Sequence, residues 1–310
     1  MDRIFVVGCP RSGTTLVQAM LARHPSIFSL RETFFFESLL GGSNVRWGDR
    51  EARAHRRWYH RAGAAQSWGR RRLLELERIY RPEKPPRRAP MGWRPCALRY
   101  VAMLDAAADR RGCRAWVEKT PAHLLFLDEI LEVAPDARIL HVLRRGRDVV
   151  ASVMDADLRL QTAGFRGSIA HWAARWNRAV QLHLLRLGDP RHHLVCLEDL
   201  VANPEVEWRR LCDFLGLDKA LPLLAQPVND VADSQSEPWK GNAIAGVIER
   251  PSDKAQALFG PRILDWLQTH LIDYDAVRQL VHRDRESVSE PPHELQRVRA
   301  LRAAKKNGAS

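Results

Sequence analysis

The chain has 310 residues, of which 45% are hydrophobic and 28% charged, a composition typical of a globular protein with a sizeable core. No run approaches the 18 apolar residues of a membrane span, and the start lacks the features of a signal peptide, so we expect a soluble, cytoplasmic protein. The net charge of +12 suits a polyanionic ligand, although only seven of the 49 basic residues are lysine, and a bias towards arginine would explain part of it. Basic clusters at 53–61, 70–72 and 87–88 occur without a nucleic-acid motif, and we interpret them as solvated helix faces.

The first predicted elements are a strand, a glycine-rich turn and a helix over 14–23. The turn reads Gly8-Cys9-Pro10-Arg11-Ser12-Gly13-Thr14-Thr15, with the glycine spacing of a phosphate-binding loop, whose amides and helix N-terminus cradle an anion. A nucleotide P-loop carries lysine where this chain has Thr14, and here the cation is Arg11. This difference argues against ATP or GTP as a phosphoryl donor.

A short strand over 27–30 follows, and it ends at Arg31-Glu32-Thr33. Ligands of open α/β sheets collect at the carboxyl ends of strands. Glu32 is therefore a candidate for chemistry, with a surface or helix N-cap carboxylate as the alternative.

Residues 41–99 change character, with Gly-Gly-Ser, a helical segment rich in arginine and tryptophan, and several prolines. We predict an insertion or lid that covers the site. Its aromatic side chains either contact an acceptor or form a satellite core, and they are Trp47, Trp58, Tyr59, Trp68 and Trp93.

A helix over 98–112, a strand over 114–118 and a helix starting at Thr120-Pro121 come next. Lys119 then lies at another strand end. His123, inside that helix, is interpreted as a helix-surface histidine in preference to a catalytic one.

The strand over 138–143 ends at Arg144, and a helix over 149–154 carries Ser152. This spacing brings a guanidinium and a hydroxyl onto one phosphate, whereas a plain strand and capped helix is the alternative. The strand lacks the terminal aspartate that holds Mg²⁺ in P-loop NTPases, so we expect no metal.

The remaining predicted elements are a helix over 167–187, a strand over 194–197, a helix from 203 to 215 and a helical segment over 252–274 with a break at 260–261. Such alternation predicts a single α/β domain over 1–282, with a P-loop-type three-layer fold in which helices flank a central, mainly parallel sheet of about five strands. A basic tail over 283–310 should fray.

Five segments carry a resemblance to a known family. PRSGTT after an apolar strand resembles the 5′-phosphosulfate loop of sulfotransferases that use 3′-phosphoadenosine 5′-phosphosulfate (PAPS), and the arginine form with RET is most similar to the tyrosylprotein and bacterial branch. EKTP resembles that family's second lysine-bearing segment, and the Arg144 to Ser152 spacing resembles its 3′-phosphate motif. LEDLVANPEVEWRRLCDFLGL is similar to the post-strand segment, where Leu197 replaces a tyrosine that contacts adenine in relatives, and SQSEPWKGN resembles the late basic loop.

The resemblance implies transfer of a sulfuryl group from PAPS to a hydroxyl or amine by in-line displacement, which leaves adenosine 3′,5′-bisphosphate and needs no metal. Glu32 would be the general base, while Arg11 and Lys119 would stabilise charge. The implied cofactor ligands are Arg11, Ser12, Gly13, Thr14, Thr15, Arg144, Ser152 and Lys240. Small-molecule, glycan, lipid and peptide acceptors stay open, as does the oligomeric state. The alternative functions are a P-loop small-molecule kinase and a non-catalytic protein that binds nucleic acid or anions.

Overall fold

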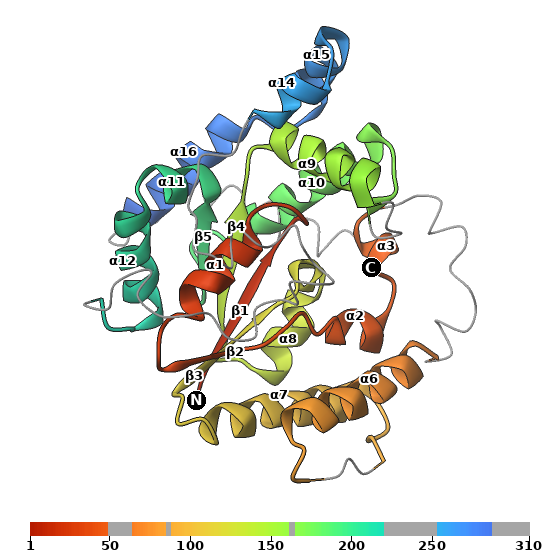
Figure 1. The fold of residues 1–310 in the computed structure, drawn as a ribbon, viewed down its shortest axis with the longest axis vertical. Helices are drawn as coiled ribbons and strands as arrows, with labels where there is room; N and C mark the ends of the chain where they lie inside the picture. The colour runs from red at the N-terminus through yellow and green to blue at the C-terminus, as the bar shows by residue number, and fades with distance from the viewer. Residues whose placement is uncertain (49–63, 85–87, 161–164, 220–252, 287–310) are drawn as a thin grey trace, which may run out of the picture.

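The computed structural model describes residues 1–48, 64–84, 88–160, 165–219 and 253–286. A sheet of five strands lies at its centre, in the order β2-β3-β1-β4-β5 (Figure 1). Every strand pairing is parallel, as expected. The strands are β1 Asp2–Gly8, β2 Ile27–Ser29, β3 Ala115–Lys119, β4 Arg138–Leu143 and β5 His192–Cys196.

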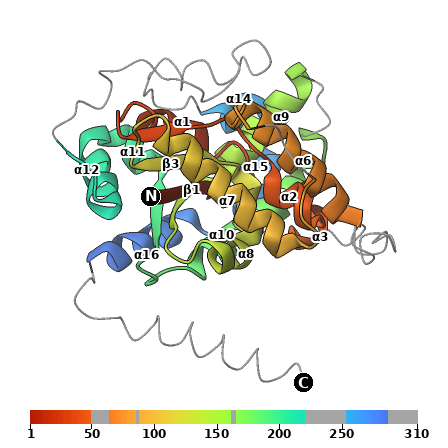
Figure 2. The ribbon, with the colours of Figure 1, turned by 90° about the horizontal axis from the view of Figure 1, so that it is seen from below.

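Helices cover both faces of the sheet, because alternate residues of each strand point to opposite faces (Figure 2). Ile4 and Val6 of β1 belong to one core cluster, and Phe5 and Val7 to the other. The Ile4 side is covered by α1 Thr14–Leu21, α11 Leu197–Ala202 and α12 Pro204–Leu215. The Phe5 side is covered by α2 Phe35–Leu40, α6 Ala64–Tyr80, α7 Trp93–Asp109, α8 Leu127–Val133, α10 Ile169–Leu184 and α16 Tyr274–Glu286. The three-layer architecture is therefore confirmed.

After β4 the chain forms α9 Gly146–Leu160, which packs against α14 Lys254–Leu258 and α15 Pro261–His270. The helix expected over 149–154 is thus longer at both ends. Among the described residues, no helix is both long and apolar enough to cross a membrane.

The helix expected from Pro121 is a 3₁₀-helix, η1 Pro121–Phe126, that continues into α8. Thr120 precedes it without capping it, since its hydroxyl donates to Oε1 of Glu118 at 2.6 Å. Residues 283–286, which were expected to belong to the basic tail, are part of a helix. α16 continues to Glu286, and the guanidinium of Arg285 donates to the carbonyl of Leu194.

The expected insertion contributes α3 Ser43–Arg46, α6 and the start of α7. Helix α6 approaches α2 closely, because a Cβ on Gly69 would lie 2.3 Å from Cα of Leu39. Trp47 is buried in the core, and the partly buried Trp93 packs against that core. Trp68 is exposed. Trp58 and Tyr59 lie outside the described residues.

Candidate active site

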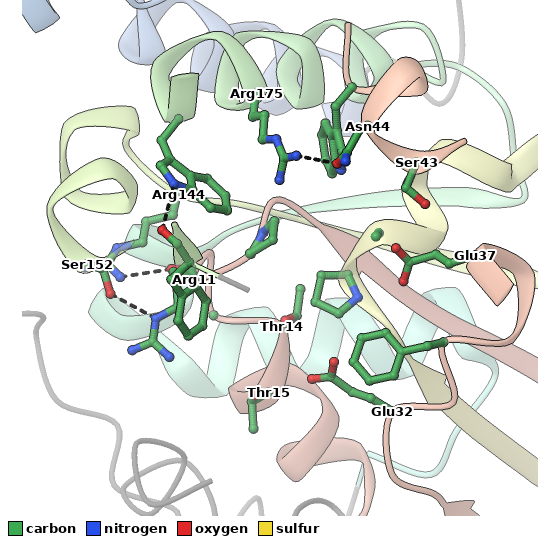
Figure 3. Close-up of a pocket in the computed structure, with 18 of the residues that line it drawn as sticks. Arg11, Thr14, Thr15, Glu32, Glu37, Ser43, Asn44, Arg144, Ser152 and Arg175 are labelled. Atoms are coloured by element: carbon green, nitrogen blue, oxygen red, sulfur yellow. Dashed lines mark hydrogen bonds between the residues drawn. The ribbon is translucent and has the colours of Figure 1, made fainter. Parts of the chain in front are cut away.

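A cavity of about 500 Å³ lies where β1, β2 and β4 end (Figure 3). Its walls come from the loops that follow these strands, from α2, α3 and η1, and from α9 and α10. Parallel strands all present their carboxyl ends at the same edge of a sheet, so segments far apart in the chain meet there.

The loop after β1 takes its shape from two glycines. Gly13 has φ 97°, in the left-handed region that favours glycine. A Cβ on Gly8 would lie 2.6 Å from the carbonyl oxygen of Val142 in β4, so the neighbouring strand leaves no room for one. This geometry starts α1 at Thr14, and Thr14 and Thr15 of its first turn line the cavity.

Arg11, Arg144 and Ser152 converge on one side of the cavity (Figure 3). Nε of Arg11 donates to Oγ of Ser152 at 3.2 Å, and a terminal nitrogen of Arg144 donates to the carbonyl of Arg11 at 3.1 Å. The indole of Trp176 donates to the carbonyl of Arg144 at 2.9 Å. The loop after β1, the end of β4 and helix α9 are thereby held together.

The two arginines place positive charge in a largely dehydrated setting. Burial lowers the pKa of Arg11, repulsion from Arg144 lowers it further, and burial also lowers the pKa of Arg144. Within the described part of the chain, Nε of Arg144 is buried without a hydrogen-bond partner. One buried and one partly buried guanidinium group, together with an unused donor, suit a phosphate or another multivalent anion.

Glu32 lines the cavity, and its carboxylate forms a hydrogen-bonded ion pair with the ammonium of Lys119. The side chain of Lys119 is fully buried, whereas that of Glu32 is 15% exposed. The lysine thus lies behind the carboxylate. Ser12 is also buried, and neither Ser12 nor Lys119 is among the residues found to line the cavity.

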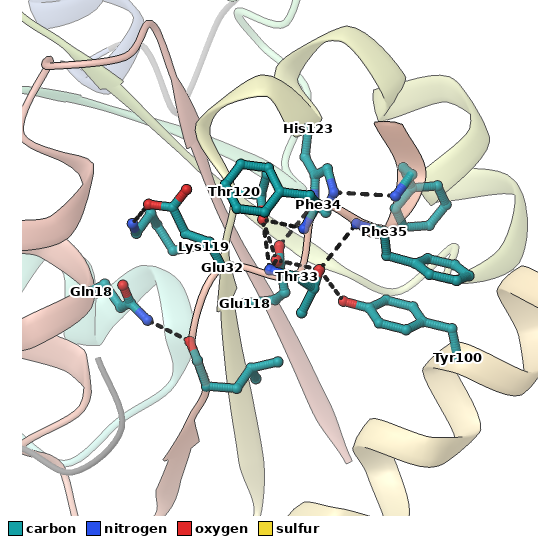
Figure 4. Close-up of polar contacts among 12 residues, drawn as sticks. Gln18, Glu32, Thr33, Phe34, Phe35, Tyr100, Glu118, Lys119, Thr120 and His123 are labelled. Carbon is teal, nitrogen blue, oxygen red and sulfur yellow. Dashed lines mark hydrogen bonds and ion pairs between the residues drawn. The ribbon is translucent and has the colours of Figure 1, made fainter. Parts of the chain in front are cut away.

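Glu118 organises a buried network behind this wall (Figure 4). Its carboxylate accepts hydrogen bonds from the hydroxyls of Thr33 at 2.8 Å and Thr120 at 2.6 Å, and contacts Nδ1 of His123 at 2.9 Å. Burial pushes the pKa of Glu118 upward, but His123 and the two hydroxyls outweigh it and hold that pKa below its usual value. The network ties the loop after β2 to the end of β3.

The interpretation of His123 as a helix-surface residue is wrong, because its side chain is fully buried. Its Nε2 accepts from the backbone N–H of Phe36 at 3.4 Å, while Nδ1 faces Glu118. The buried carboxylate of Glu118 supplies the partner that lets a polar ring occupy the interior. Both nitrogens therefore face protein groups behind the cavity wall.

Glu37, Asn44 and Arg175 line the part of the cavity away from Arg11, and the sequence analysis missed them (Figure 3). A terminal nitrogen of Arg175 donates to Oδ1 of Asn44 at 2.7 Å. Burial raises the pKa of Glu37, and the nearby Glu32 adds to the effect. These residues belong to no motif and come from three separate helices, so only tertiary packing brings them together.

Two further residues named in the sequence analysis are Leu197 and Lys240. Leu197 packs beneath the loop after β1, since a Cβ on Gly13 would lie 2.7 Å from its Cδ1, and it is buried in the core. Lys240 lies outside the described residues. Among the residues that the structure describes, no three His, Cys, Asp or Glu side chains are arranged so that they could hold a metal ion.

Two curated proteins are similar to this chain in sequence. A protein-tyrosine sulfotransferase of Drosophila melanogaster is 28% identical over 260 residues, 82% of this chain and 44% of its own length. Protein-tyrosine sulfotransferase A of Caenorhabditis elegans is 26% identical over 229 residues, 70% of this chain and 51% of its own length. The chain thus spans about half the length of these relatives.

A solved structure supports the fold. The sulfotransferase domain from the Synechococcus PCC 7002 olefin synthase matches with a TM-score of 0.51 and 20% identity, covering 88% of this chain and 95% of that one. The family model described as "Sulfotransferase family" matches residues 3–220. Because this match spans well over half of the chain and includes the loop after β1, Glu32, Lys119, Arg144 and Ser152, the chain belongs to the sulfotransferase family.

Proposed function

We propose that the chain transfers a sulfuryl group from PAPS to a hydroxyl acceptor. The observation that carries the proposal is the convergence of Arg11, Arg144 and Ser152 on one side of a cavity that Glu32 also lines. The relatives named protein-tyrosine sulfotransferases support a hydroxyl acceptor, and the family match disfavours a kinase or a nucleic-acid-binding protein.

The residues present fit the cofactor. Arg144 and Ser152 would hold the 3′-phosphate, which would supply a partner for the unused Nε of Arg144. Arg11, the amides of residues 12–15 and the N-terminus of α1 would hold the 5′-phosphosulfate. PAPS supplies a sulfuryl group attached to a phosphate that leaves readily. Lys240 stays a predicted further ligand.

Glu32 would accept the proton of the acceptor hydroxyl as the acceptor oxygen bonds to sulfur and the bond from sulfur to the phosphate oxygen breaks. Lys119 favours the ionised carboxylate that this step requires, because an adjacent ammonium stabilises it. Arg11 and the loop amides would stabilise the charge that develops on the leaving phosphate. Lys119, buried behind Glu32, would act on the reaction through that carboxylate.

The decisive experiment offers PAPS with labelled sulfur and ATP with labelled γ-phosphate, in parallel, to phenol, sugar, lipid and peptide acceptors. We expect label to move from PAPS alone and transfer to persist in EDTA. Phosphate transfer from ATP that stops on chelation would instead indicate a kinase. A salt-sensitive gel shift with nucleic acid and no transfer would indicate a binding protein. Independence from metal and a cytoplasmic location stay predictions until measured.

A further inference from the structure

Phe34, the residue after Arg31-Glu32-Thr33, behaves unlike its two neighbours. Phe35 and Phe36 are fully buried in the core, whereas the ring of Phe34 is 47% exposed and lines the cavity. Figure 4 shows Phe34 close to Glu32 and Thr120. An apolar ring is therefore held open to solvent beside the proposed base.

The backbone of Phe34 is in the left-handed region, with φ 49° and ψ 25°. Among the described residues outside glycine, only Arg11 shares a positive φ. A bulky side chain adopts this conformation at a cost in energy. Phe34 also occupies the N-cap position of α2, where the amides of the first two helical residues donate to Thr33 and His123 instead of to a capping side chain. The residue type thus disagrees with its backbone conformation, and helix capping does not explain it.

The surrounding network imposes this conformation. The hydroxyl oxygen of Thr120 accepts from the backbone N–H groups of Thr33 at 3.2 Å and Phe34 at 3.3 Å. The carbonyl of Phe34 accepts from the N–H of Ser38 at 3.0 Å, which fixes the other side of the residue. Backbone strain that a rigid neighbourhood maintains is characteristic of functional sites. Here the strained backbone places one aromatic ring at the wall of the cavity.

We propose that Phe34 selects the acceptor, by packing against a flat aromatic ring that carries the reacting hydroxyl. The proposal rests on the proposed sulfuryl transfer and adds the residue that distinguishes an aryl hydroxyl, the acceptor that the names of the relatives suggest, from an alkyl one. Aromatic rings pack favourably face to edge or offset, and an exposed ring gains most from a partner that removes it from water. Trp47, Pro121 and Ala122 add apolar surface to the same cavity.

The chemistry of Glu32 points the same way. A carboxylate is a weak base, and a phenolic hydroxyl with a pKa of about 10 releases its proton far more readily than an alkyl alcohol does. Phenols include both small molecules and the tyrosine side chain of a peptide. The shared group is the aryl hydroxyl, and an experiment separates the two sources.

The test compares binding of 4-ethylphenol and 4-ethylcyclohexanol, which are similar in size but differ in the flatness of the ring. Each is titrated into the protein with and without saturating adenosine 3′,5′-bisphosphate. We expect the protein to bind 4-ethylphenol about fivefold more tightly, the range of an aromatic pair. Phe34→Asn and Phe34→Leu should both lose this preference and keep the affinity for the bisphosphate.

Stability gives an independent readout. Asparagine tolerates the left-handed backbone better than phenylalanine does, so Phe34→Asn should unfold at the same temperature as the parent or at a higher one. Leu158→Asn is the matched control, because Leu158 is 70% exposed on α9 and lies outside the cavity lining. It should keep the full preference for the phenol.

Equal binding of the two probes by the parent protein would overturn the proposal, as would a preference that survives in both Phe34 variants. A large loss of stability in Phe34→Asn would also overturn it, because the ring would then be structural. A failure to bind the bisphosphate would reject PAPS as cofactor, yet the titration without bisphosphate would still decide the role of Phe34. A third titration, with a tyrosine peptide, identifies the source of the aryl ring. Binding of the peptide indicates a peptide acceptor, whereas binding of 4-ethylphenol without binding of the peptide indicates a small phenol. Either result supports the aryl site.

Discussion

Ser152 and Arg144 contact the same residue, Arg11, through different atoms. Their substitution should therefore affect the same part of the nucleotide site. If both hold a 3′-phosphate, Ser152→Ala and Arg144→Ala should weaken binding of adenosine 3′,5′-bisphosphate far more than binding of adenosine 5′-phosphate. Each charge-assisted contact should account for about 1.5–3 kcal/mol. Calorimetric titration with the two nucleotides measures the difference.

A control for this prediction lies on the same helix. Arg147 of α9 pairs with Asp253 at 3.1 Å, and it is not among the residues that line the cavity. Arg147→Ala should change neither affinity appreciably. Equal losses for both nucleotides in Ser152→Ala would show that this side chain does not read the 3′-phosphate.

Glu32→Gln keeps the size of the side chain and removes the proton acceptor. The amide oxygen can still accept from Lys119, so affinity for adenosine 3′,5′-bisphosphate should stay nearly unchanged. The transfer rate should fall by roughly 10² to 10⁴ fold, the usual share of general base catalysis. Single-turnover transfer from labelled PAPS to a phenol measures it, and a variant that retains near-parental turnover would remove Glu32 from the role of base.

For individual residues, the sequence predicted which side chains of the spaced motifs lie at the cavity. Arg11, Glu32, Arg144 and Ser152 all line the cavity, because motif spacing placed each at the carboxyl end of a strand or on the helix that follows. The pairing of Lys119 with Glu32 could not be predicted. It depends on which face of β3 Lys119 occupies and on the path of the loop after β2 that carries Glu32, 87 positions earlier in the chain.

Among elements, the junction between β3 and the loop after β2 depends on Glu118. Glu118→Gln would leave His123 without its charged partner and weaken the bonds to Thr33 and Thr120. Removing one member of a buried pair usually lowers the free energy of unfolding by about 3–5 kcal/mol. Urea unfolding would measure the loss, and the transfer rate should fall as well, because Thr33 adjoins Glu32.

Asp128→Asn is the comparison for that prediction. Asp128 is 84% exposed and pairs with Arg186 at the surface, so its substitution should change stability by less than about 0.5 kcal/mol. A Glu118→Gln protein as stable as Asp128→Asn would show that the network does not hold the junction together.

The strands were predicted better than the helix boundaries, for a physical reason. Strands buried on both faces appear in sequence as continuous apolar runs, such as Ile4 to Val7 in β1. The helix starts at Pro121 as predicted, but the side chain of Thr120 does not cap it, because its hydroxyl donates to Glu118 instead. A local capping pattern cannot reveal that a distant or buried group competes for the same hydroxyl.

At the scale of the molecule, a chain of three hydrogen-bonded histidines joins β4, α10 and β5. Nδ1 of His141 lies 2.8 Å from Nδ1 of His183, and its Nε2 lies 2.7 Å from Nδ1 of His192. Burial lowers the pKa of all three, to about 3 for His183 and about 4 for His192. Burial also lowers the pKa of His193 to about 3.

These shifts predict acid lability. The pKa values in the folded protein lie below the unfolded value of about 6.5, so below that pH the unfolded chain binds more protons. The free energy of unfolding should therefore fall as the pH drops from about 6.5 towards 4, by roughly 1 kcal/mol per pH unit for each histidine. Urea unfolding at pH 7, 6 and 5 measures the slope.

His193→Leu should make that slope shallower by up to roughly 1 kcal/mol per pH unit, since one of the titrating groups is gone. His270→Leu, at an exposed position on α15, is its control and should keep the parental slope. Identical slopes for the parent and His193→Leu would mean that His193 does not contribute to acid lability.

The elements that form the cavity walls differ in burial and in backbone pairing. β1, which leads into the loop carrying Arg11, is paired on both sides and buried from Ile4 to Gly8, whereas α3 has no buried residue and supplies Ser43 and Asn44. Amide hydrogens of β1 should therefore exchange with deuterium only through global opening, and those of α3 through local fluctuations. Local fluctuations would then open the end of the cavity lined by Ser43 and Asn44 many times for each opening of the end that carries Arg11.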